Sequence, residues 1–381
     1  MIYLDNSATT RVLDEAAEAA SSAMREGFYN PAAAYKSAVR TEKTVNECRK
    51  RLAAAMGREA DEIVYTSGGT ESNNTAILST VFGYRGKPHI ITSMIEHPSV
   101  YNVFQMLEAK GLADVTYIGT DAGGAPSMEE LKSALRPDTL LVSLMHVNNE
   151  TGAITDLQTA SMLVRRNSPS ALIHVDGVQA FCKLPFSRIP CDFYSVSAHK
   201  FHAPKGIGAL MVGANVKFAG GLIGGGQERN LRSGTTNVPG IVGMDAALSV
   251  YRRNHADWLM RMRACKLRLA AGVLQIPDTF VNGPSPEEGA GHILNISFPG
   301  VRGEVLLNAL SEREIYVSTG SACSAQKKGK NRVLTTMGIR GDRQEGAIRF
   351  SFSPFNTLEE MDIVAQQLNE IVPFLRRYKR R

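Results

Sequence analysis

Seven short apolar runs rich in β-branched residues recur along the first 213 residues of this 381-residue chain. Stretches compatible with helices separate most of them, at 41–57, 71–83, 98–111, 128–136 and 157–167. The runs themselves span residues 62–66, 89–94, 114–119, 139–145, 171–176, 191–197 and 208–213. Because parallel strands need a crossover between them, this alternation predicts an α/β fold: a mostly parallel sheet with helices on both faces.

The chain beyond residue 250 has a different order of elements. A long helical pattern over about 244–275 leads to an apolar run at 292–300, a helix near 303–311 and another apolar run at 315–320. This order predicts a smaller α+β domain. We expect an N-terminal segment (1–15) that packs with the small domain, a large domain (16–250) and the small C-terminal domain (251–381).

Five of the apolar runs lead straight into polar motifs. These motifs are TSGGTESNN, EHPS, NNETG, DGVQ and SAHK. In an open α/β sheet, ligands bind beyond the carboxyl ends of the strands. The sequence therefore predicts one binding site built from these five motifs.

The first motif is a strand, a glycine-rich turn and the start of a helix. Gly68 and Gly69 allow a tight turn, and Thr70 begins a helix whose N-terminus attracts an anion. The motif lacks the GK[ST] sequence of a nucleoside triphosphate loop, so we expect the phosphate of another ligand. A simple turn without a ligand is the alternative.

Asp176 ends the apolar run 171–176, where a carboxylate is costly unless it meets a cation. The alternative is that Asp176 caps a helix over the following residues GVQAF. Gln179 lies three residues further on and can face the same ligand as Asp176.

Lys200 stands in the sequence SAHKFHAPKG, directly after an apolar run. A lysine near desolvating groups and other cations loses its proton more easily and becomes a nucleophile that can form an imine. Ser197 and His199 flank it as hydrogen-bond donors. A metal site formed by His199 and His202 is a weaker alternative, because Pro204 follows closely and a third ligand is missing nearby.

These parts match the requirements of pyridoxal 5'-phosphate. The helix N-terminus binds the phosphate, an acid keeps the ring nitrogen protonated, and a lysine holds the aldehyde. His97 in EHPS is a candidate to stack on the ring or to transfer protons, and a histidine that only satisfies its loop is the alternative.

Cysteine content and charge limit the setting in which the chain works. Five cysteines are scattered without a CxxC pair, so a disulfide framework is not expected and a reducing cytoplasm fits best. We find no run that could cross a membrane and no secretory signal at the N-terminus. The net charge is +6, which we interpret as solvated helix faces rather than a surface for direct nucleic-acid binding.

The ordered motifs resemble those of the cysteine desulfurases, within the class V aminotransferase group of pyridoxal-phosphate enzymes of fold type I. The resemblance covers almost the full length and rests on YLDNSATT, NPAAAY, TSGGTESNN, EHPSV, VNNETG, HVDGVQ, SAHKFHAPKGIGAL, GGGQERNLRSGTTNV, STGSACSA and IRFSF. It implies a large cofactor-binding domain and a small domain that carries a catalytic cysteine loop.

The resemblance also implies roles for individual residues. Lys200 forms the Schiff base, Asp176 faces the ring nitrogen, Gln179 faces the ring oxygen and His97 stacks on the ring. The phosphate is held by Gly69, Thr70, Ser197, Ala198 and His199, and by Thr235 of a neighbouring subunit, so a homodimer is implied. Asn149 lies near the ring oxygen and substrate, and Arg349 binds the substrate carboxylate.

Cys323 lies in STGSACSA, followed by the basic sequence QKKGKN, a context that favours an exposed thiolate. The resemblance makes Cys323 the persulfide carrier in the conversion of L-cysteine to L-alanine. The sulfur would pass to a protein acceptor, in iron–sulfur cluster assembly, with a possible iron–sulfur contact through Cys323, or in tRNA thiolation. Two alternatives are a selenocysteine lyase or other class V enzyme, and a sulfur-relay scaffold with a vestigial site.

The chain departs from the usual pattern of the family in four places. Residues 30–35 read NPAAAY, Asn230 stands where glycine is common, Thr151 replaces isoleucine, and Ser353-Pro354 replaces Gly-Arg.

Overall fold

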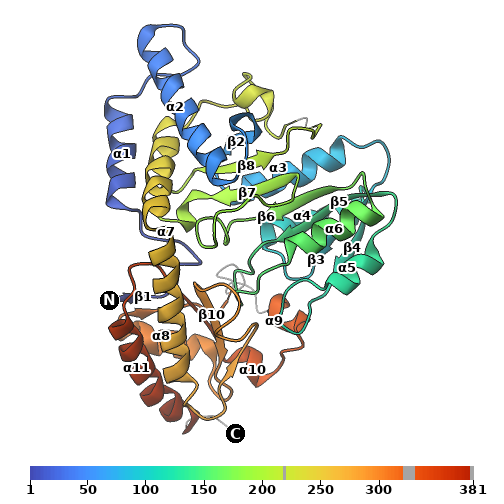
Figure 1. The fold of residues 1–381 in the computed structure, drawn as a ribbon. Helices are drawn as coiled ribbons and strands as arrows, with labels where there is room; N and C mark the ends of the chain where they lie inside the picture. The colour runs from blue at the N-terminus through green and yellow to red at the C-terminus, as the bar shows by residue number, and fades with distance from the viewer. Residues whose placement is uncertain (218–219, 321–330, 378–381) are drawn as a thin grey trace.

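A seven-stranded sheet forms the centre of the larger of two lobes in the computed structural model, which describes residues 1–217, 220–320 and 331–377 (Figure 1). The strand order is β2-β8-β7-β6-β5-β3-β4. The strands are β2 (Ile63–Thr66), β3 (His89–Ser93), β4 (Asp114–Ile118), β5 (Thr139–Met145), β6 (Leu172–Asp176), β7 (Phe193–Ser197) and β8 (Gly208–Val212). All seven lie where the sequence predicts them, to within two residues at each end.

Strand β8 is the exception in a sheet that is otherwise parallel, because it runs antiparallel to both β7 and β2. Only residues 198–207 join β7 to β8, and they contain a single 3-10 turn, η2 (Ala198–Lys200). A parallel crossover needs a dozen residues or more, so this short connection must return antiparallel. Thr66 and Ser197 both pair with Gly208, which places the carboxyl ends of β2 and β7 at the same edge.

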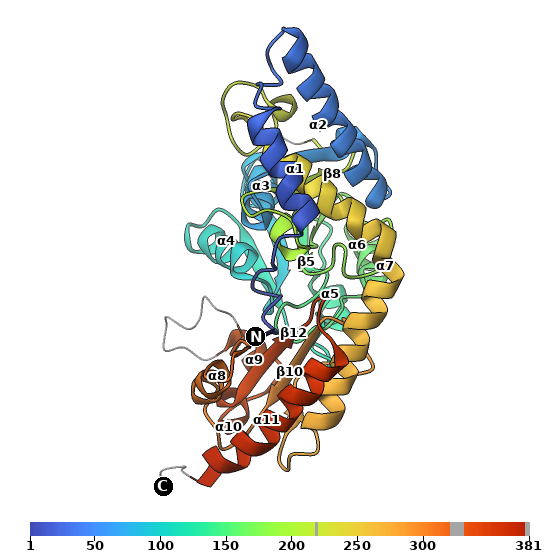
Figure 2. The ribbon, with the colours of Figure 1, turned by 90° about the vertical axis from the view of Figure 1, so that its left-hand side faces the viewer.

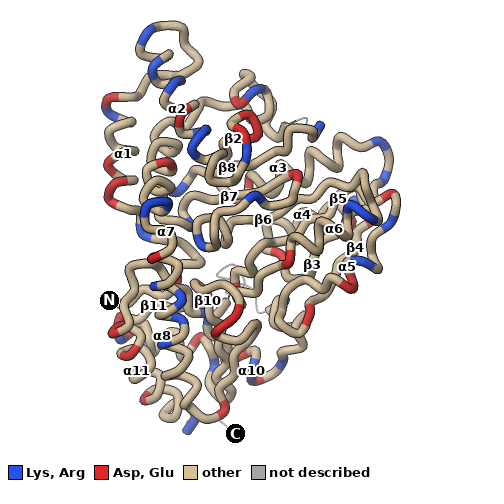
Figure 3. The backbone as a smooth tube through the Cα atoms, in the orientation of Figure 1, with Lys and Arg blue, Asp and Glu red and all other residues tan. Residues whose placement is uncertain are grey.

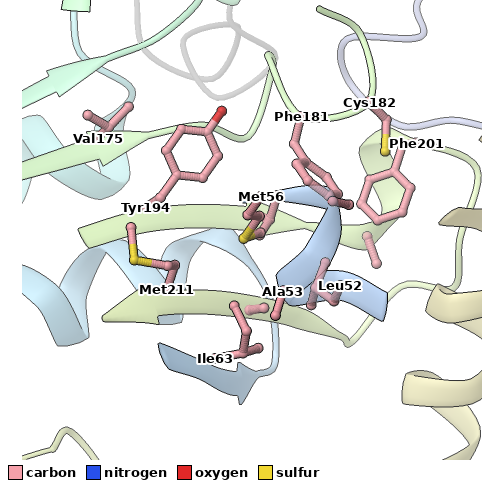
Figure 4. Packing of buried hydrophobic residues seen from close by; sticks show 14 of the residues in the cluster. Leu52, Ala53, Met56, Ile63, Val175, Phe181, Cys182, Tyr194, Phe201 and Met211 are labelled. Carbon is pink, nitrogen blue, oxygen red and sulfur yellow. The ribbon is translucent and has the colours of Figure 1, made fainter. Parts of the chain in front are cut away.

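Helices cover both faces of the large sheet, as the sequence predicts. One face packs against α2 (Lys36–Ala55), α5 (Met128–Ala134), α6 (Leu157–Asn167) and the first part of α7 (Val238–Val273). The other face packs against α3 (Gly69–Phe82) and α4 (Pro98–Ala109). Side chains alternate between the faces, so that Ile91 joins the first core and Ile90 the second. Figure 4 shows Leu52 of α2 and Met56, which follows this helix, over the first face.

The smaller lobe contains a three-stranded antiparallel sheet in the order β12-β10-β9. Its strands are β9 (Phe280–Val281), β10 (Ile293–Ser297) and β12 (Ala347–Ser351). Its helices are α8 (Gly303–Ser311), α9 (Arg332–Thr336), α10 (Asp342–Glu345) and α11 (Leu358–Arg377). The apolar side chains of the sheet, α8 and α11 share one core with the second part of α7.

Helix α7 connects the two lobes without interruption (Figure 2). Trp258 still belongs to the core of the large lobe, whereas Met262 belongs to the core of the small lobe. The boundary expected between residues 250 and 251 therefore falls inside a continuous helix. The division into domains remains a prediction.

The N-terminal segment belongs to both lobes. Ile2 and Leu4 lie in the core of the small lobe, where β1 (Ile2–Tyr3) pairs in parallel with β11 (Ile315–Tyr316). The chain then enters α1 (Asp14–Arg25), which lies beside α7 and contributes Ala16 to the core of the large lobe (Figure 1). Residues between β1 and α1 consequently pass the junction of the lobes.

Charged residues of both signs are interspersed in the view of Figure 3, which fits the interpretation of solvated surface faces. Within the described residues, no helix is both long and apolar enough to span a membrane.

Candidate active site

A cavity of about 220 Å³ lies at the carboxyl edge of the large sheet, where the two lobes meet. It is lined by Ser7, Ala8, Gly69, Thr70, Asn73, His97, Pro98, Ser99, Met145, Val147, Asn149, Asp176, Val178, Gln179, Ser197, His199, Lys200 and Arg349. All five polar motifs of the sequence contribute to this lining. The N-terminal segment and the small lobe add residues that come from outside the sheet.

The N-terminus of α3 faces this cavity through a turn that admits only glycine. Gly68 has φ of +151°, which side chains rarely adopt. A Cβ on Gly69 would lie 2.6 Å from Cγ2 of Val178, so the backbone lies directly against the cavity wall. Among the described residues, no side chain caps the helix. Its first amide groups can therefore bind an anion.

Lys200 is the last residue of η2, the turn that directly follows β7, and is half-buried. Its Nζ donates hydrogen bonds to the carbonyl oxygens of Ser7 at 2.6 Å and Ala8 at 2.8 Å. Next to it, Nδ1 of His199 lies 3.1 Å from Oγ1 of Thr9. The N-terminal segment therefore holds the end of β7 in place, and the lysine amine lies against that segment.

Asp176 is the last residue of β6 and is 5% exposed. Its Oδ2 accepts a hydrogen bond from Nδ2 of Asn73 at 2.8 Å, and its Oδ1 accepts one from the backbone N–H of Val178 at 3.0 Å. Both donors are neutral. A buried carboxylate with neutral donors gains most from a cationic ligand group, because desolvating a charge is costly without an opposite charge.

His97 begins α4, where Pro98 occupies the first helical position. Its Nδ1 accepts a hydrogen bond from the backbone N–H of Ser99 at 3.1 Å, which leaves the ring proton on Nε2. Burial lowers the pKa of His97, and the charges of Lys200 and Arg332 lower it further, while Asp176 opposes them. The ring is therefore held neutral beside the cavity.

Gln179 lies on the same side of the cavity as Lys200. Its Nε2 donates to the carbonyl oxygen of Ser7 at 2.9 Å, and its Oε1 accepts from Nζ of Lys183 at 2.9 Å. The carbonyl oxygen of Ser7 can only accept, so Nε2 must face it and the orientation of the Gln179 amide is determined. Burial lowers the pKa of Lys183 well below its usual range, with a further contribution from the charge of Lys200.

Arg349 reaches the cavity from β12 of the small lobe and is 2% exposed. Its Nη2 lies 2.6 Å from Oδ1 of Asp5, and its Nη1 donates to the carbonyl oxygen of Asn149 at 3.0 Å. Its Nε has no hydrogen-bond partner among the described residues. The guanidinium is fixed between the lobes, and its geometry suits a carboxylate ligand.

Ten of the predicted site residues line the cavity: Gly69, Thr70, His97, Asn149, Asp176, Gln179, Ser197, His199, Lys200 and Arg349. Ala198 is buried beneath this lining, and Thr235 is exposed outside it. Cys323 lies in 321–330, outside the described residues. The roles of all these residues remain predictions.

Sequence reasoning assigned no role to Ser7, Ala8, Asn73 or Ser99, which also line the cavity. Asn73 links Asp176 to Ser99 by donating to Oγ of Ser99 at 2.9 Å. Asn73 lies one helical turn after Thr70 on α3, so the sequence could have predicted that it faces the same cavity as Thr70. No local sequence pattern could predict the contact of Ser7 with Lys200, because these residues are 193 positions apart.

The cysteines that the structure describes are Cys48, Cys182, Cys191 and Cys265, and all four are buried free thiols. Burial raises the pKa of Cys48 and Cys191 to about 12 and that of Cys265 to about 11. The pKa of Cys182 is raised as well, again by burial. None of these four is a good thiolate nucleophile at neutral pH. The described residues also contain no cluster of three or more His, Cys, Asp or Glu side chains that could hold a metal ion.

Comparison with known proteins agrees with this geometry. The family model described as aminotransferase class-V matches residues 2–364, so the chain belongs to the class-V aminotransferase family. The predicted fold class is thereby confirmed.

Curated relatives identify a narrower group within this family. The chain is 40% identical over 378 residues to "Cysteine desulfurase IscS" of Methanosarcina thermophila, covering 98% of this chain and 93% of that protein. It is 39% identical to "Cysteine desulfurase 2" of Trichormus variabilis, with coverage of 99% and 94%. These relatives place the chain in the cysteine desulfurase group of the family, which confirms the resemblance.

Solved structures give the same result. A structure described as a NifS-like protein matches with a TM-score of 0.91 and 35% identity, over 98% of this chain and 99% of that one. A structure of SspA in complex with cysteine matches with a TM-score of 0.82 and 31% identity, over 94% of this chain and 100% of that one.

Proposed function

We propose that this protein is a pyridoxal-phosphate-dependent cysteine desulfurase, which converts L-cysteine to L-alanine and stores the sulfur as a persulfide on Cys323. One observation supports this proposal above the others. Lys200, Asp176 and His97 line a single cavity with the open N-terminus of α3.

The residues present fit pyridoxal phosphate. The amides at Gly69 and Thr70, with Ser197, Ala198 and His199, would hold the phosphate. Asp176 would hold the protonated ring nitrogen, Gln179 and Asn149 would face the ring oxygen, and His97 would face the ring. Once bound, the cofactor supplies an electron sink for bonds at the α-carbon of the amino acid. The Gly69 backbone, which leaves no room for a side chain, and the neutral donors around Asp176 support this fit.

Arg349 and Asn149 orient the substrate. The planar guanidinium of Arg349 binds the carboxylate of L-cysteine, in the geometry that arginine and carboxylates prefer. Nζ of Lys200 takes the proton from the α-carbon, moving away from the carbonyl groups of Ser7 and Ala8. His97 is neutral and hydrogen-bonded through Nδ1, so its Nε2–H is the group available to donate a proton.

Cys323 receives the sulfur atom. Its thiolate attacks the sulfur of the substrate, so that a sulfur–sulfur bond forms while the carbon–sulfur bond breaks. The carbon that loses sulfur keeps the electron pair and takes up a proton, which gives L-alanine. This step needs no external oxidant or reductant. The raised pKa values of the four described cysteines support Cys323 as the nucleophile.

The protein acts with partners. A homodimer in which Thr235 reaches the phosphate of the neighbouring site accounts for the exposure of Thr235 away from its own cavity. The persulfide passes to a protein acceptor that serves iron–sulfur cluster assembly or tRNA thiolation. The cytoplasm, where free thiols persist, is the proposed location.

The test is alanine formation from L-cysteine by the protein loaded with cofactor. Cys323→Ser is expected to abolish alanine formation, because serine cannot form a persulfide, while the visible absorbance of bound cofactor stays unchanged. Cys265→Ala, which removes a buried thiol, is the control and should keep the activity. Normal alanine formation by Cys323→Ser would refute the assignment.

A further inference from the structure

Glu150 is a buried carboxyl group that the proposed chemistry does not use. It is 5% exposed and lies in the loop after β5, between Asn149 and Thr151. Oδ1 of Asn148 accepts hydrogen bonds from the backbone N–H groups of Glu150 and Thr151, both at 2.9 Å. Asn148 therefore holds the backbone of the loop at Glu150 and Thr151.

The carboxyl group of Glu150 joins the large lobe to the small lobe. Its Oε2 accepts a hydrogen bond from Nδ2 of Asn331 at 2.5 Å. Oδ1 of Asn331 accepts from the backbone N–H of Leu334 at 2.9 Å and caps α9. Because the cap uses the amide oxygen, the amide nitrogen of Asn331 must face Glu150.

Gly320 lies against the same carboxyl group. Its φ is +112°, and a Cβ there would lie 2.9 Å from Oε2 of Glu150 and 2.9 Å from Nδ2 of Asn331. Oγ of Ser318 donates to the carbonyl oxygen of Gly320 at 2.9 Å, and Ser318 bridges to Arg349. Gly320 and Asn331 are the residues that flank 321–330 on either side, and both lie at one carboxyl group.

Neighbouring groups hold this junction to the large lobe. Arg332 donates to the carbonyl oxygens of Met94 and Glu96, and its guanidinium lies 3.7 Å from the ring centroid of Tyr101. Burial raises the pKa of Glu150, while the hydrogen bond from Asn331 and the charges of Arg349 and Arg332 lower it.

We propose that Glu150 is a positioning residue for sulfur transfer, which fixes Asn331 and Gly320, the described residues on either side of the segment that carries Cys323. Cys323 is three residues after Gly320, and three residues span at most about 11 Å. The neighbouring carbonyl group of Asn149 holds Arg349, so one loop positions both the substrate carboxylate and the start of the cysteine segment. This inference rests on the proposed function.

The test exchanges the two partners of the hydrogen bond. Asn331→Asp keeps the size of the side chain and its cap of α9, but it removes the donor and places a carboxylate against Glu150. Glu150→Gln with Asn331→Asp restores the hydrogen bond in the reverse direction, from the glutamine amide to the aspartate. Glu62→Gln is the control, because Glu62 is another buried glutamate whose partners, Arg58 and the N–H of Glu59, lie away from the cavity.

We expect Asn331→Asp to lower kcat for alanine formation at least about tenfold, in line with the cost of leaving a buried acceptor without its donor. KM for L-cysteine should change less than about threefold, because Arg349 still binds the carboxylate. The change in cofactor absorbance on adding L-cysteine should keep its wild-type rate. The rate at which iodoacetamide alkylates Cys323 should differ from the rate in wild type. The double variant should recover to within about threefold of the wild-type kcat.

An unchanged kcat in Asn331→Asp would overturn the inference. So would a double variant no better than either single variant, or a loss confined to the absorbance change. If Glu150→Gln fails to fold alone, Asn331→Asp and the double variant still decide the outcome. Failure of the proposed function looks different, because wild type and Glu62→Gln would then form no alanine.

Discussion

Lys183 illustrates at the scale of a residue how burial sets the charge of a group beside the cavity. It is 5% exposed, and its Nζ donates to Oε1 of Gln179. Burial and the nearby charge of Lys200 both favour the neutral amine. A neutral amine still donates a hydrogen bond, so Gln179 keeps the orientation that directs its Nε2 to Ser7.

Replacing Lys183 with methionine should change how stability depends on pH. The unfolded lysine keeps its usual pKa near 10.4, whereas the folded one has a lowered pKa, so between these values the unfolded chain binds more protons. The free energy of unfolding of wild type should therefore rise relative to Lys183→Met as the pH increases from 7 to 10. The rise should reach at most about 1.4 kcal/mol per pH unit.

Urea denaturation of both proteins across this pH range measures the difference, in which the other titrating groups cancel. A difference that stays flat or falls would mean that Lys183 is charged in the folded protein.

At the scale of the element, a strained turn precedes Thr235. The three residues of η3 (Glu228–Asn230) have positive φ values of 48°, 58° and 65°, and none of them is glycine. The turn is held by Arg49, whose Nη1 and Nη2 lie 2.6 and 2.8 Å from the carboxylate of Glu228. This conformation suits glycine, which the family resemblance implies at position 230. Asparagine tolerates it better than other side chains do.

Two substitutions at Asn230 should therefore have different effects. Asn230→Gly should leave the free energy of unfolding within about 0.5 kcal/mol of wild type, because glycine adopts positive φ without strain. Asn230→Ala should lower it by about 1 kcal/mol, the cost of a left-handed residue with a Cβ. Urea denaturation distinguishes the two, and equal stabilities would show that the turn is not strained at this position.

Thr151, another departure from the family pattern, also has a local explanation. It is buried, and its hydroxyl donates to Oδ1 of Asn148 at 3.2 Å. The polar group that replaces isoleucine therefore has a hydrogen-bond partner inside the protein.

At the scale of the whole molecule, the active site depends on how the two lobes are placed. Arg349 comes from the small lobe, and Lys200 comes from the large lobe. Two covalent connections hold these lobes together in the described structure, the N-terminal segment and α7. Because α7 is uninterrupted, it fixes the position of the core around Met262 relative to the core around Trp258.

Proline at position 260 should disturb this connection. Met260 is 65% exposed and lies on α7 between the two cores, so its side chain contributes little packing. Met260→Pro removes a helical hydrogen bond and should cost about 3 kcal/mol or more. It should also reduce alanine formation, because Arg349 moves relative to Lys200. Met260→Ala is the control and should change stability by less than about 0.5 kcal/mol.

The measurements are urea denaturation and the rate of alanine formation. A proline variant with wild-type stability and activity would show that α7 does not set the placement of the lobes.

Much of the fold could be predicted because its elements depend on local patterns. The strands at 139–145 and 208–213 and the helix at 303–311 follow from runs of apolar residues and their periodicity. The direction of β8 could also have been read from the short connection at 198–207. Helices α1 and α11 were missed, although their amphipathic patterns are visible once their bounds are known.

The sequence by itself determined the alternation of strands and helices. It thereby also determined the edge of the large sheet at which Asp176 and Lys200 both lie, because parallel strands place their carboxyl ends together. Only the tertiary structure decided that Ser7 accepts from Lys200 and that Glu150 meets both Gly320 and Asn331. These contacts join distant segments, and their geometry depends on how two separate cores pack around one helix.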